Sequence, residues 1–255
     1  MLQEERHKKI LEQLEVNNTI RIAQISEKLG VTPQTVRRDL SELEKAGFIK
    51  KVHGGAVLNR TNMEPPYSKR ASTSIPEKER IAEKAAEIVE DGDAIYIDIG
   101  TTTLLMAKKL KSRKNLTVIT NSLLVAIELA DSTGIKVILS GGELRGKELS
   151  LSGPISNQSI QNIFIDKAFI GVGGLSVDSG YTDFHIHESE FRRMMIAHAK
   201  MSYALADHSK INVVAIFKSA DIHEIEVLIT DEKTPNSIIH VLEEKGIEVI
   251  VVPEN

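Results

Sequence analysis

The first 45 residues show the hydrophobic pattern of short amphipathic helices. Apolar side chains recur at spacings of three and four residues within residues 2–16, 23–29 and 32–45. This spacing places them on one face of an α-helix and leaves the opposite face polar. A short strand is expected at residues 19–22, and residues 30–31 form the turn between the second and third helices. Two short helices joined by a glycine-containing turn predict a helix-turn-helix.

The third helix has a clear beginning and end in the sequence. Thr32 is a suitable N-cap, and Gly47 follows the last turn as a terminator. Val36, Leu40 and Leu43 share the apolar face, so the remaining side chains point away from the core. The polar face carries Gln34, Arg37, Arg38, Ser41 and Lys45. A cationic, hydrogen-bonding surface of this kind can enter the major groove of DNA.

A basic β-hairpin is predicted behind this helix. Residues 48–52 form a short strand that carries Lys50 and Lys51, and residues 56–58 form a second strand. The tight turn between the two strands consists of His53, Gly54 and Gly55. Helix, hairpin and exposed arginines together are typical of a winged helix-turn-helix. The alternative is that these cations form an ordinary solvated face, which is the usual meaning of a charge run.

A polar stretch separates this module from the rest of the chain. Residues 59–74 contain Pro65 and Pro66 and have no apolar period, so they predict an interdomain linker. We therefore expect a DNA-binding domain at residues 1–58 and a second domain at residues 75–255.

From residue 75 onward, helical segments alternate with short apolar runs. Strands are expected at residues 94–99, 116–120, 136–139, 167–172, 203–206, 227–229 and 249–252. Helices are expected at residues 76–89, 102–110, 122–130, 155–160, 188–199 and 236–244. This alternation favours an α/β fold, with a mostly parallel sheet covered by helices on both faces.

Ligands of such sheets bind beyond the carboxyl ends of the strands, where unusual polar residues collect in this sequence. The first strand is followed by Asp98, Gly100, Thr101, Thr102 and Thr103. Their N–H groups and hydroxyls could hold an anion at a helix N-terminus, although threonine there is also an ordinary cap. Neither a Walker A nor a GxGxxG pattern is present, so no nucleotide is inferred.

Other strand ends add candidates for the same edge of the sheet, although each could be only a turn. They are Asn121, Gly141, Gly142, Glu143 and Gly173. Thr182 and Glu188 offer hydroxyl and carboxylate partners for sugar hydroxyls. Lys210, three residues after Asp207, could neutralise a phosphate as a point charge. The alternative for Asp207 and Lys210 is an exposed ion pair, which contributes little.

A metal site is suggested by His185, His187 and Glu188, but we do not predict one. Alternate spacing places the two imidazoles on opposite sides of a strand, and nothing nearby completes a tetrahedral set. The sequence contains no cysteine, which excludes disulfides, thiolate metal sites and a cysteine nucleophile. No metal ion, other cofactor or catalytic residue is therefore expected.

Composition narrows the class of protein. A chain of 255 residues with 41% hydrophobic content has room for two ordinary domains. It has no apolar run of membrane-spanning length and no apolar signal region at its N-terminus, so we expect a cytoplasmic protein without a membrane partner. The net charge is −4, but residues 1–60 carry +3 and the rest −7. A small basic module on an acidic body suits local binding to a phosphate backbone.

The chain resembles the DeoR family of bacterial transcriptional regulators, whose signature is matched by Arg6, Ile10, Leu14, Thr32, Thr35 and the VRRDL sequence of residues 36–40. The resemblance implies a winged helix-turn-helix followed by a sugar-phosphate-sensing domain. It also implies that residues 32–45 are the recognition helix and residues 50–55 the wing. The family's sensor domain is similar in fold to ribose-5-phosphate isomerase, glucosamine-6-phosphate deaminase and CoA transferases.

These observations predict a transcriptional repressor of a carbohydrate-utilisation operon, released from double-stranded operator DNA by a phosphorylated sugar. A homodimer or homotetramer is expected, since one short helix contacts too few bases for useful affinity. An alternative is a sugar-phosphate isomerase or deaminase with a DNA-binding extension, using Asp98, Glu143, Glu188 and Lys210 as acid–base groups. A third hypothesis is an architectural DNA-binding protein whose second domain binds no ligand.

Overall fold

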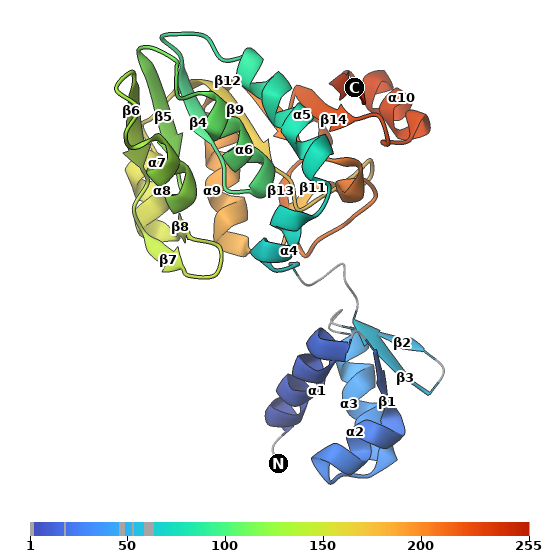
Figure 1. The fold of residues 1–255 in the computed structure, drawn as a ribbon. Helices are drawn as coiled ribbons and strands as arrows, with labels where there is room; N and C mark the ends of the chain where they lie inside the picture. Colours follow the sequence, from blue (N-terminus) through green and yellow to red (C-terminus); the bar gives the residue numbers. More distant parts are fainter. Residues whose placement is uncertain (1–2, 18, 46–48, 53, 59–63, 255) are drawn as a thin grey trace. The chain divides into compact units, whose positions relative to one another are not determined.

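The computed structural model describes residues 3–17, 19–45, 49–52, 54–58 and 64–254. The chain divides into two compact units, Met1–Glu64 and Pro65–Asn255 (Figure 1). Each unit has its own hydrophobic core, so each is described by itself.

The first unit packs helices against a small antiparallel sheet. Its described helices are α1 (Gln3–Asn17), α2 (Ile22–Leu29) and α3 (Pro33–Lys45). Its described strands, in the sheet order β1-β3-β2, are β1 (Thr19–Arg21), β3 (Gly55–Leu58) and β2 (Ile49–Val52). Apolar residues at helical spacing, including Ile10, Leu14, Val36 and Leu40, are completely buried between these elements. The predicted helix-turn-helix and hairpin are confirmed.

The turn between α2 and α3 follows from its sequence. Gly30 ends α2 in the left-handed conformation, with φ 64°, which glycine adopts without strain. Thr32 then accepts a hydrogen bond from the backbone N–H of Thr35 at 3.2 Å, as expected of an N-cap. The expected helix terminator Gly47 and the turn residue His53 lie outside the described residues.

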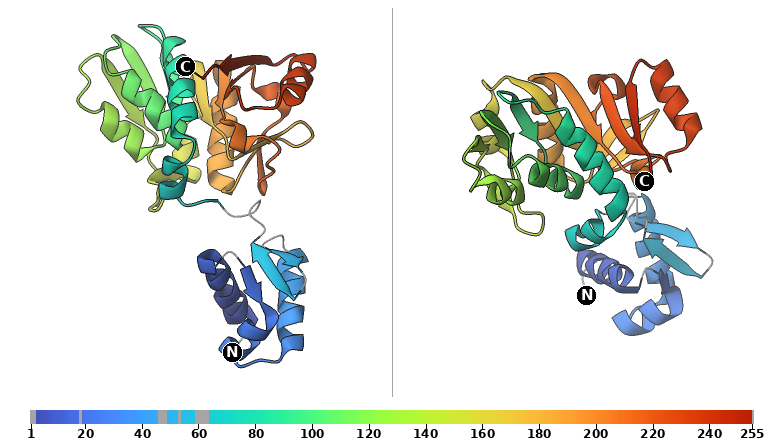
Figure 2. Two further views of the ribbon diagram at one scale, coloured as in Figure 1. Left: turned by 45° about the vertical axis from the view of Figure 1, so that its right-hand side comes forward. Right: turned by 45° about the horizontal axis from the view of Figure 1, so that its top comes forward.

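The second unit is built on a seven-stranded parallel sheet with the order β15-β14-β12-β9-β4-β5-β6 (Figure 2). The strands are β4 (Ala94–Ile97), β5 (Leu116–Thr120), β6 (Ile135–Leu139), β9 (Ile165–Gly171), β12 (Ala199–Leu205), β14 (Val227–Asp231) and β15 (Glu248–Val252). Successive residues of the central strands are buried on opposite faces, because helices cover both sides.

Two helical layers supply the cores on either face of this sheet. One face packs α5 (Ile75–Glu87), α6 (Thr101–Lys109) and α7 (Leu123–Leu129) around residues such as Ile81, Met106 and Phe169. The other face packs α8 (Pro154–Ile160), α9 (Ile186–Ala197) and α10 (Asn236–Glu244) around residues such as Ile170 and Phe191. No helix in the described part of the chain is long and apolar enough to cross a membrane.

The strand order reverses between β4 and β9. From β4 the chain proceeds outward to β5 and β6, whereas β9, β12, β14 and β15 proceed in the opposite direction. Crossovers on the two sides of such a point diverge and leave a crevice at the carboxyl ends of the strands. The candidate effector residues after β4, β5, β6, β9 and β12 therefore share this edge, as predicted.

Several elements were missed by the hydrophobic pattern. A hairpin of β7 (Glu143–Arg145) and β8 (Ser150–Ser152) follows β6. A small antiparallel sheet contains β10 (Gly174–Ser176), β11 (Gly180–Asp183) and β13 (Phe217–Ala220). Short 3₁₀ turns occur at η2 (His208–Lys210) and η3 (Ile222–Glu224). These elements are too short, and too rich in glycine and polar residues, to show a period.

The prediction of a linker extending to residue 74 is wrong for its second half. Residues 65–74 belong to the second unit and contain α4 (Tyr67–Ser72). This segment has no apolar stripe and is held by polar contacts. Arg70 pairs with Glu148 and donates to the carbonyl of Pro65 at 2.9 Å. The Lys78 ammonium also donates to the carbonyl of Thr73 at 2.8 Å.

Candidate functional site

The exposed face of α3 carries the cations expected to contact DNA. Val36 and Leu40 are fully buried on one side of the helix, while Arg37 and Arg38 are exposed on the other. Arg38 contacts Glu42 only at 3.4 Å, and its side chain remains 81% exposed. The guanidinium is therefore accessible to a ligand.

The first strand of the hairpin, β2, is tied to this helix by Lys51. Its N–H donates to Glu44 Oε1 at 2.7 Å, and its Nζ lies 3.2 Å from Ser41 Oγ. The hydrogen bond from Lys51 lowers the pKa of Glu44. Ser41 also donates to the carbonyl of Arg37 at 2.9 Å. Ser41 and Lys51 thus fix the hairpin to α3, while Lys50 remains exposed.

Arg6 has a structural role that its place in the signature did not reveal. Its Nε and Nη2 donate to the two carboxylate oxygens of Asp39 at 2.8 and 2.9 Å, and Asp39 is only 1% exposed. This bidentate pair joins α1 to α3. A hollow opens on the surface beside it, lined by Gln3, Arg6, Thr32, Gln34, Thr35, Arg37, Arg38 and Ser41. Gly54 lies in the described hairpin turn, and the Lys45 backbone ends α3.

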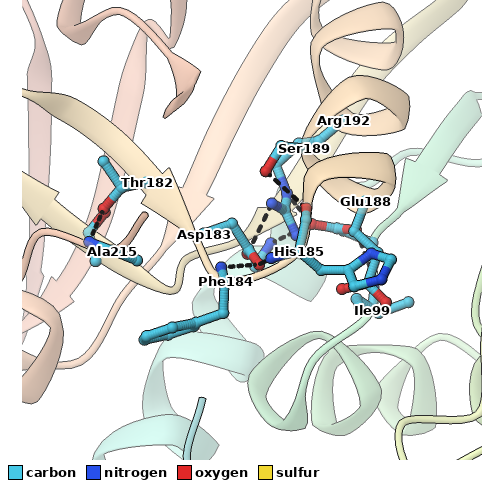
Figure 3. A network of polar contacts seen from close by, with 12 residues as sticks. Ile99, Thr182, Asp183, Phe184, His185, Glu188, Ser189, Arg192 and Ala215 are labelled. Carbon is cyan, nitrogen blue, oxygen red and sulfur yellow. Dashed lines mark hydrogen bonds and ion pairs between the residues drawn. The ribbon is translucent and has the colours of Figure 1, made fainter. Parts of the chain in front are cut away.

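A buried ionic network occupies the point where the strand order reverses. Arg192 of α9 donates from Nε to Asp98 Oδ2 at 2.6 Å. It also donates from Nη1 to Asp183 Oδ2 at 2.8 Å (Figure 3). Burial opposes the guanidinium charge, but the two carboxylates outweigh it and keep the pKa of Arg192 above its ordinary value. Arg192 is not among the site residues expected from the sequence, because arginine is almost never fully buried unless it is paired.

Asp98 is surrounded by donors. Besides Arg192, its carboxylate accepts hydrogen bonds from the Tyr96 hydroxyl at 2.6 Å and from the N–H groups of Ile99 and Gly171 at 2.8 and 3.0 Å. The side chain is 1% exposed. This geometry favours a supporting role for Asp98, in place of the direct effector contact expected from the sequence.

Thr182 and Gly173 are also engaged within the protein. Thr182 Oγ1 donates to the carbonyl of Gly174 at 3.1 Å and accepts from the N–H of Ala215 at 2.9 Å (Figure 3). A Cβ atom on Gly173 would lie 2.8 Å from the carbonyl oxygen of Thr182, so glycine permits a close approach of two backbones. Both residues therefore serve to build the wall of the site.

The groups with capacity for a ligand lie around α6 and β5. Gly100 precedes α6, and the first N–H groups of any helix, here those of Thr101, Thr102 and Thr103, lack intrahelical acceptors. Asn121, at the end of β5, is fully buried, and its side-chain oxygen lies 3.0 Å from the Tyr96 hydroxyl. Its Nδ2 has no hydrogen-bond partner among the described residues. A buried donor of this kind is suited to a polar ligand atom.

A cluster of cations lies near the start of α5. Lys78 is only 4% exposed, and burial lowers its pKa; Asp207 opposes this shift, whereas Lys210 and Arg70 add to it. Like charges at short range are costly, and a bound anion relieves that cost. The sequence singled out Lys210 but not Lys78, because lysine in the first turn of an amphipathic helix is normally solvated.

The β7–β8 hairpin is tied to α9 through Glu188. Arg145 Nη1 and Ser150 Oγ donate to the two carboxylate oxygens of Glu188, at 2.8 and 2.5 Å. Burial raises the pKa of Glu188 to about 7, against the influence of Arg145. Glu143, by contrast, is exposed on β7, and Gly141 and Gly142 adopt positive φ values of 69° and 106° in the preceding turn.

The histidines at positions 185 and 187 do not assemble a metal site. Their rings lie edge to face at 5.8 Å, and His187 Nδ1 contacts Glu190 at 3.1 Å. Within the described ranges, no group of three or more potential ligands of the types His, Asp and Glu could hold a metal ion.

Comparisons with known proteins agree with this architecture. Residues 6–62 match the family model of the DeoR-like helix-turn-helix domain, and residues 73–232 match that of the DeoR C terminal sensor domain. The HTH-type transcriptional regulator GolR of Listeria innocua serovar 6a is 38% identical over 96% of this chain and 97% of its own length. This chain belongs to the DeoR family. The expectation of a DNA-binding transcriptional regulator is confirmed.

Two further similarities complete the comparison of this DeoR-family chain. The glycerol-3-phosphate regulon repressor of Escherichia coli K12 is 33% identical over 98% of this chain and 99% of its own length. Among solved structures, ribose 5-phosphate isomerase A of Methanocaldococcus jannaschii matches 52% of this chain and 53% of its own, with 17% identity and a TM-score of 0.40. The strand topology and the two family models confirm the predicted fold class, a helix-turn-helix followed by an α/β domain with a parallel sheet.

Proposed function

We propose that this DeoR-family chain represses a carbohydrate-utilisation operon and that a phosphorylated sugar or polyol releases it from double-stranded operator DNA. The observation that carries the effector class is that Lys78 is buried and that two further cations, Lys210 and the Glu148-paired Arg70, act on its charge. Phosphate supplies the negative charge that such a cluster favours. The name of the E. coli relative, which mentions glycerol 3-phosphate, supports the same ligand class.

The polar part of the effector would lie towards the end of β5 and the start of α6. Asn121 offers a buried amide donor there, and Thr101 begins a helix whose first N–H groups favour an anionic or hydroxyl ligand. The side chains around this part of the site are supported by Asp98, Thr182 and Glu188, through the contacts described above. In this proposal the cations Lys78 and Lys210 face the phosphate, and Asn121 faces the sugar hydroxyls.

DNA recognition is assigned to the exposed side of α3 with the hairpin beside it. Arg37 and Arg38 can each pair with the edge of a guanine, whereas Lys50 suits a phosphate contact. We infer a homodimer or homotetramer, because paired half-sites give a short recognition helix sufficient affinity. As a bacterial type of DNA-binding regulator, the protein would act in the cytoplasm.

An enzymatic role receives less support from the geometry. The carboxylates of Asp98 and Glu188, candidates for acid–base chemistry, are each bound by an arginine, Arg192 and Arg145 respectively. Such pairing suits a rigid binding wall. We therefore propose that the protein binds a sugar phosphate without converting it, and incubation with aldose phosphates followed by product analysis tests this directly.

The proposed function is tested by selecting operator fragments from genomic DNA and measuring their release. Phosphorylated sugars and polyols are added to the protein–DNA complex, and fluorescence anisotropy reports the bound fraction. We expect at least one phosphorylated compound to release the DNA, with its unphosphorylated counterpart inactive. Selective DNA binding that no phosphorylated compound alters would contradict the effector assignment.

A further inference from the structure

We infer that His208 contacts the sugar hydroxyls of the effector, with Asp231 as the residue that positions its imidazole. This inference rests on the proposed function and adds a specificity-determining residue to it. His208 begins η2, directly after the carboxyl end of β12, and Asp231 is the last residue of the neighbouring strand β14. The two side chains therefore meet at the ligand-binding edge of the parallel sheet.

The imidazole is held in one orientation. His208 Nδ1 lies 3.0 Å from Asp231 Oδ1 and 3.2 Å from Oδ2, and the backbone N–H of His208 donates to Oδ2 at 2.8 Å. The N–H of Lys233 also donates to Oδ1 at 3.0 Å. Asp231 is completely buried, so this carboxylate has a fixed place from which it orients the ring.

The remaining ring nitrogen is available for recognition. A carboxylate accepts hydrogen bonds, so the proton of the neutral ring resides on Nδ1 and Nε2 becomes an acceptor. Both ring contacts to Asp231 are made by Nδ1 and none by Nε2, and the side chain is 31% exposed. An oriented acceptor at this position suits a hydroxyl donor.

The surroundings of His208 fit a ligand that carries both phosphate and hydroxyl groups. Asp207 and Lys210 flank it in the same turn, and both influence the charge of Lys78 on α5. His208 itself acts on the charge of Glu77, the residue before Lys78. The imidazole thus lies in the same 3₁₀ turn as Lys210, one of the cations proposed to bind phosphate.

The closing experiment separates hydroxyl recognition from phosphate binding. His208→Asn retains a side-chain donor near the Nδ1 position, so the bond to Asp231 can persist, but it removes Nε2. His208→Gln returns a polar group near the Nε2 position. The matched control is His240→Asn, since His240 is 79% exposed on α10. Affinities are measured by calorimetry for phosphorylated sugars and polyols of three to six carbons and for inorganic phosphate.

We expect His208→Asn to weaken binding of the phosphorylated sugar about three- to tenfold, the range that one hydrogen bond supplies, and to leave inorganic phosphate unaffected. His208→Gln should recover part of this loss, and His240→Asn should match the parent protein. Equal sugar-phosphate affinity in the parent and both His208 variants would overturn the inference while leaving the proposed function intact. Failure of the parent to bind any compound of the panel would overturn the proposed function and the inference with it. Thermal unfolding without ligand shows whether His208→Asn is less stable than the parent protein. If it is, the sugar-phosphate affinity of His208→Gln decides the outcome.

Discussion

Arg192 Nε lies 2.6 Å from Asp98 Oδ2, and the two side chains are 2% and 1% exposed. This pair connects α9 to the end of β4, on the two sides of the point where the strand order reverses. Arg192 also binds a second carboxylate, that of Asp183, which lies on β11. The sequence pattern identified Asp98 as a candidate, but not the buried arginine that holds it in place.

Removal of the Arg192 guanidinium should strongly destabilise the second unit. Arg192→Met leaves Asp98 and Asp183 buried without their cation, and we expect a loss of about 3–5 kcal/mol in the free energy of unfolding. Urea denaturation measures this loss. Lys200→Met is the control, because Lys200 is 79% exposed in its pair with Asp166 and should contribute about 1 kcal/mol or less. Equal, small effects of both substitutions would show that the buried network is not a stabilising element.

Glu188 should make stability depend on pH. Its pKa is about 7 in the folded protein, against 4.5 ordinarily, because burial disfavours the charged form. The carboxyl group is therefore most favourable to folding below about pH 4.5, and its contribution falls by about 3 kcal/mol as the pH rises through 7. Replacement by glutamine removes this titration.

Thermal unfolding of the parent and Glu188→Gln between pH 5 and pH 8 tests that expectation. The difference in stability between the two proteins should shift in favour of the variant as the pH rises. Glu87→Gln is the matched control, since Glu87 is 60% exposed in its pair with Lys84. A difference that stays constant over this range would contradict the raised pKa of Glu188.

The arginines of α3 should determine operator affinity without determining the fold. Arg37→Ala and Arg38→Ala leave the buried side chains Val36, Leu40 and Leu43 unchanged, so unfolding temperatures should stay close to that of the parent. Each base contact contributes roughly 1–3 kcal/mol, whereas a phosphate contact mainly changes the salt dependence. Fluorescence anisotropy over a salt series distinguishes these effects.

A charge control completes this test. Arg193→Ala removes an exposed arginine from α9, in the second unit. Operator binding should be normal in Arg193→Ala and weak in the Arg37→Ala, Arg38→Ala double variant. Normal affinity and salt dependence in the double variant would contradict the assignment of α3 to DNA recognition.

Some elements of the fold follow from the local sequence pattern alone. The apolar spacing of Val36, Leu40 and Leu43 was sufficient to predict α3, and runs such as residues 116–120 were sufficient to predict strands. Periodicity and capping are local properties, so one sequence reveals them. The edge at which candidate residues gather also follows, because parallel strands share the direction of their carboxyl ends.

The supporting contacts could not be predicted in this way. Arg70 and Glu148 are 78 positions apart, and Lys78 shows its burial only when α4 and η2 are in place. Arg145 and Glu188 likewise meet through a hairpin that has no apolar period. Such pairs depend on tertiary packing. Tertiary contacts also hold residues 65–74, the second half of the expected linker, in the second unit.

The most direct test of the account is the release of operator DNA by a phosphorylated sugar in the parent protein and in Thr101→Asp. Thr101 is half-buried at the start of α6, whereas Thr102 and Thr103 are only 7% and 0% exposed. An aspartate here is compatible with the helix N-terminus but repels an anionic effector. Release is followed by fluorescence anisotropy as the effector concentration increases. The account predicts that the variant keeps its operator affinity and needs at least about tenfold more effector for release, equivalent to 1.4 kcal/mol. Release of both proteins at the same effector concentration would contradict it.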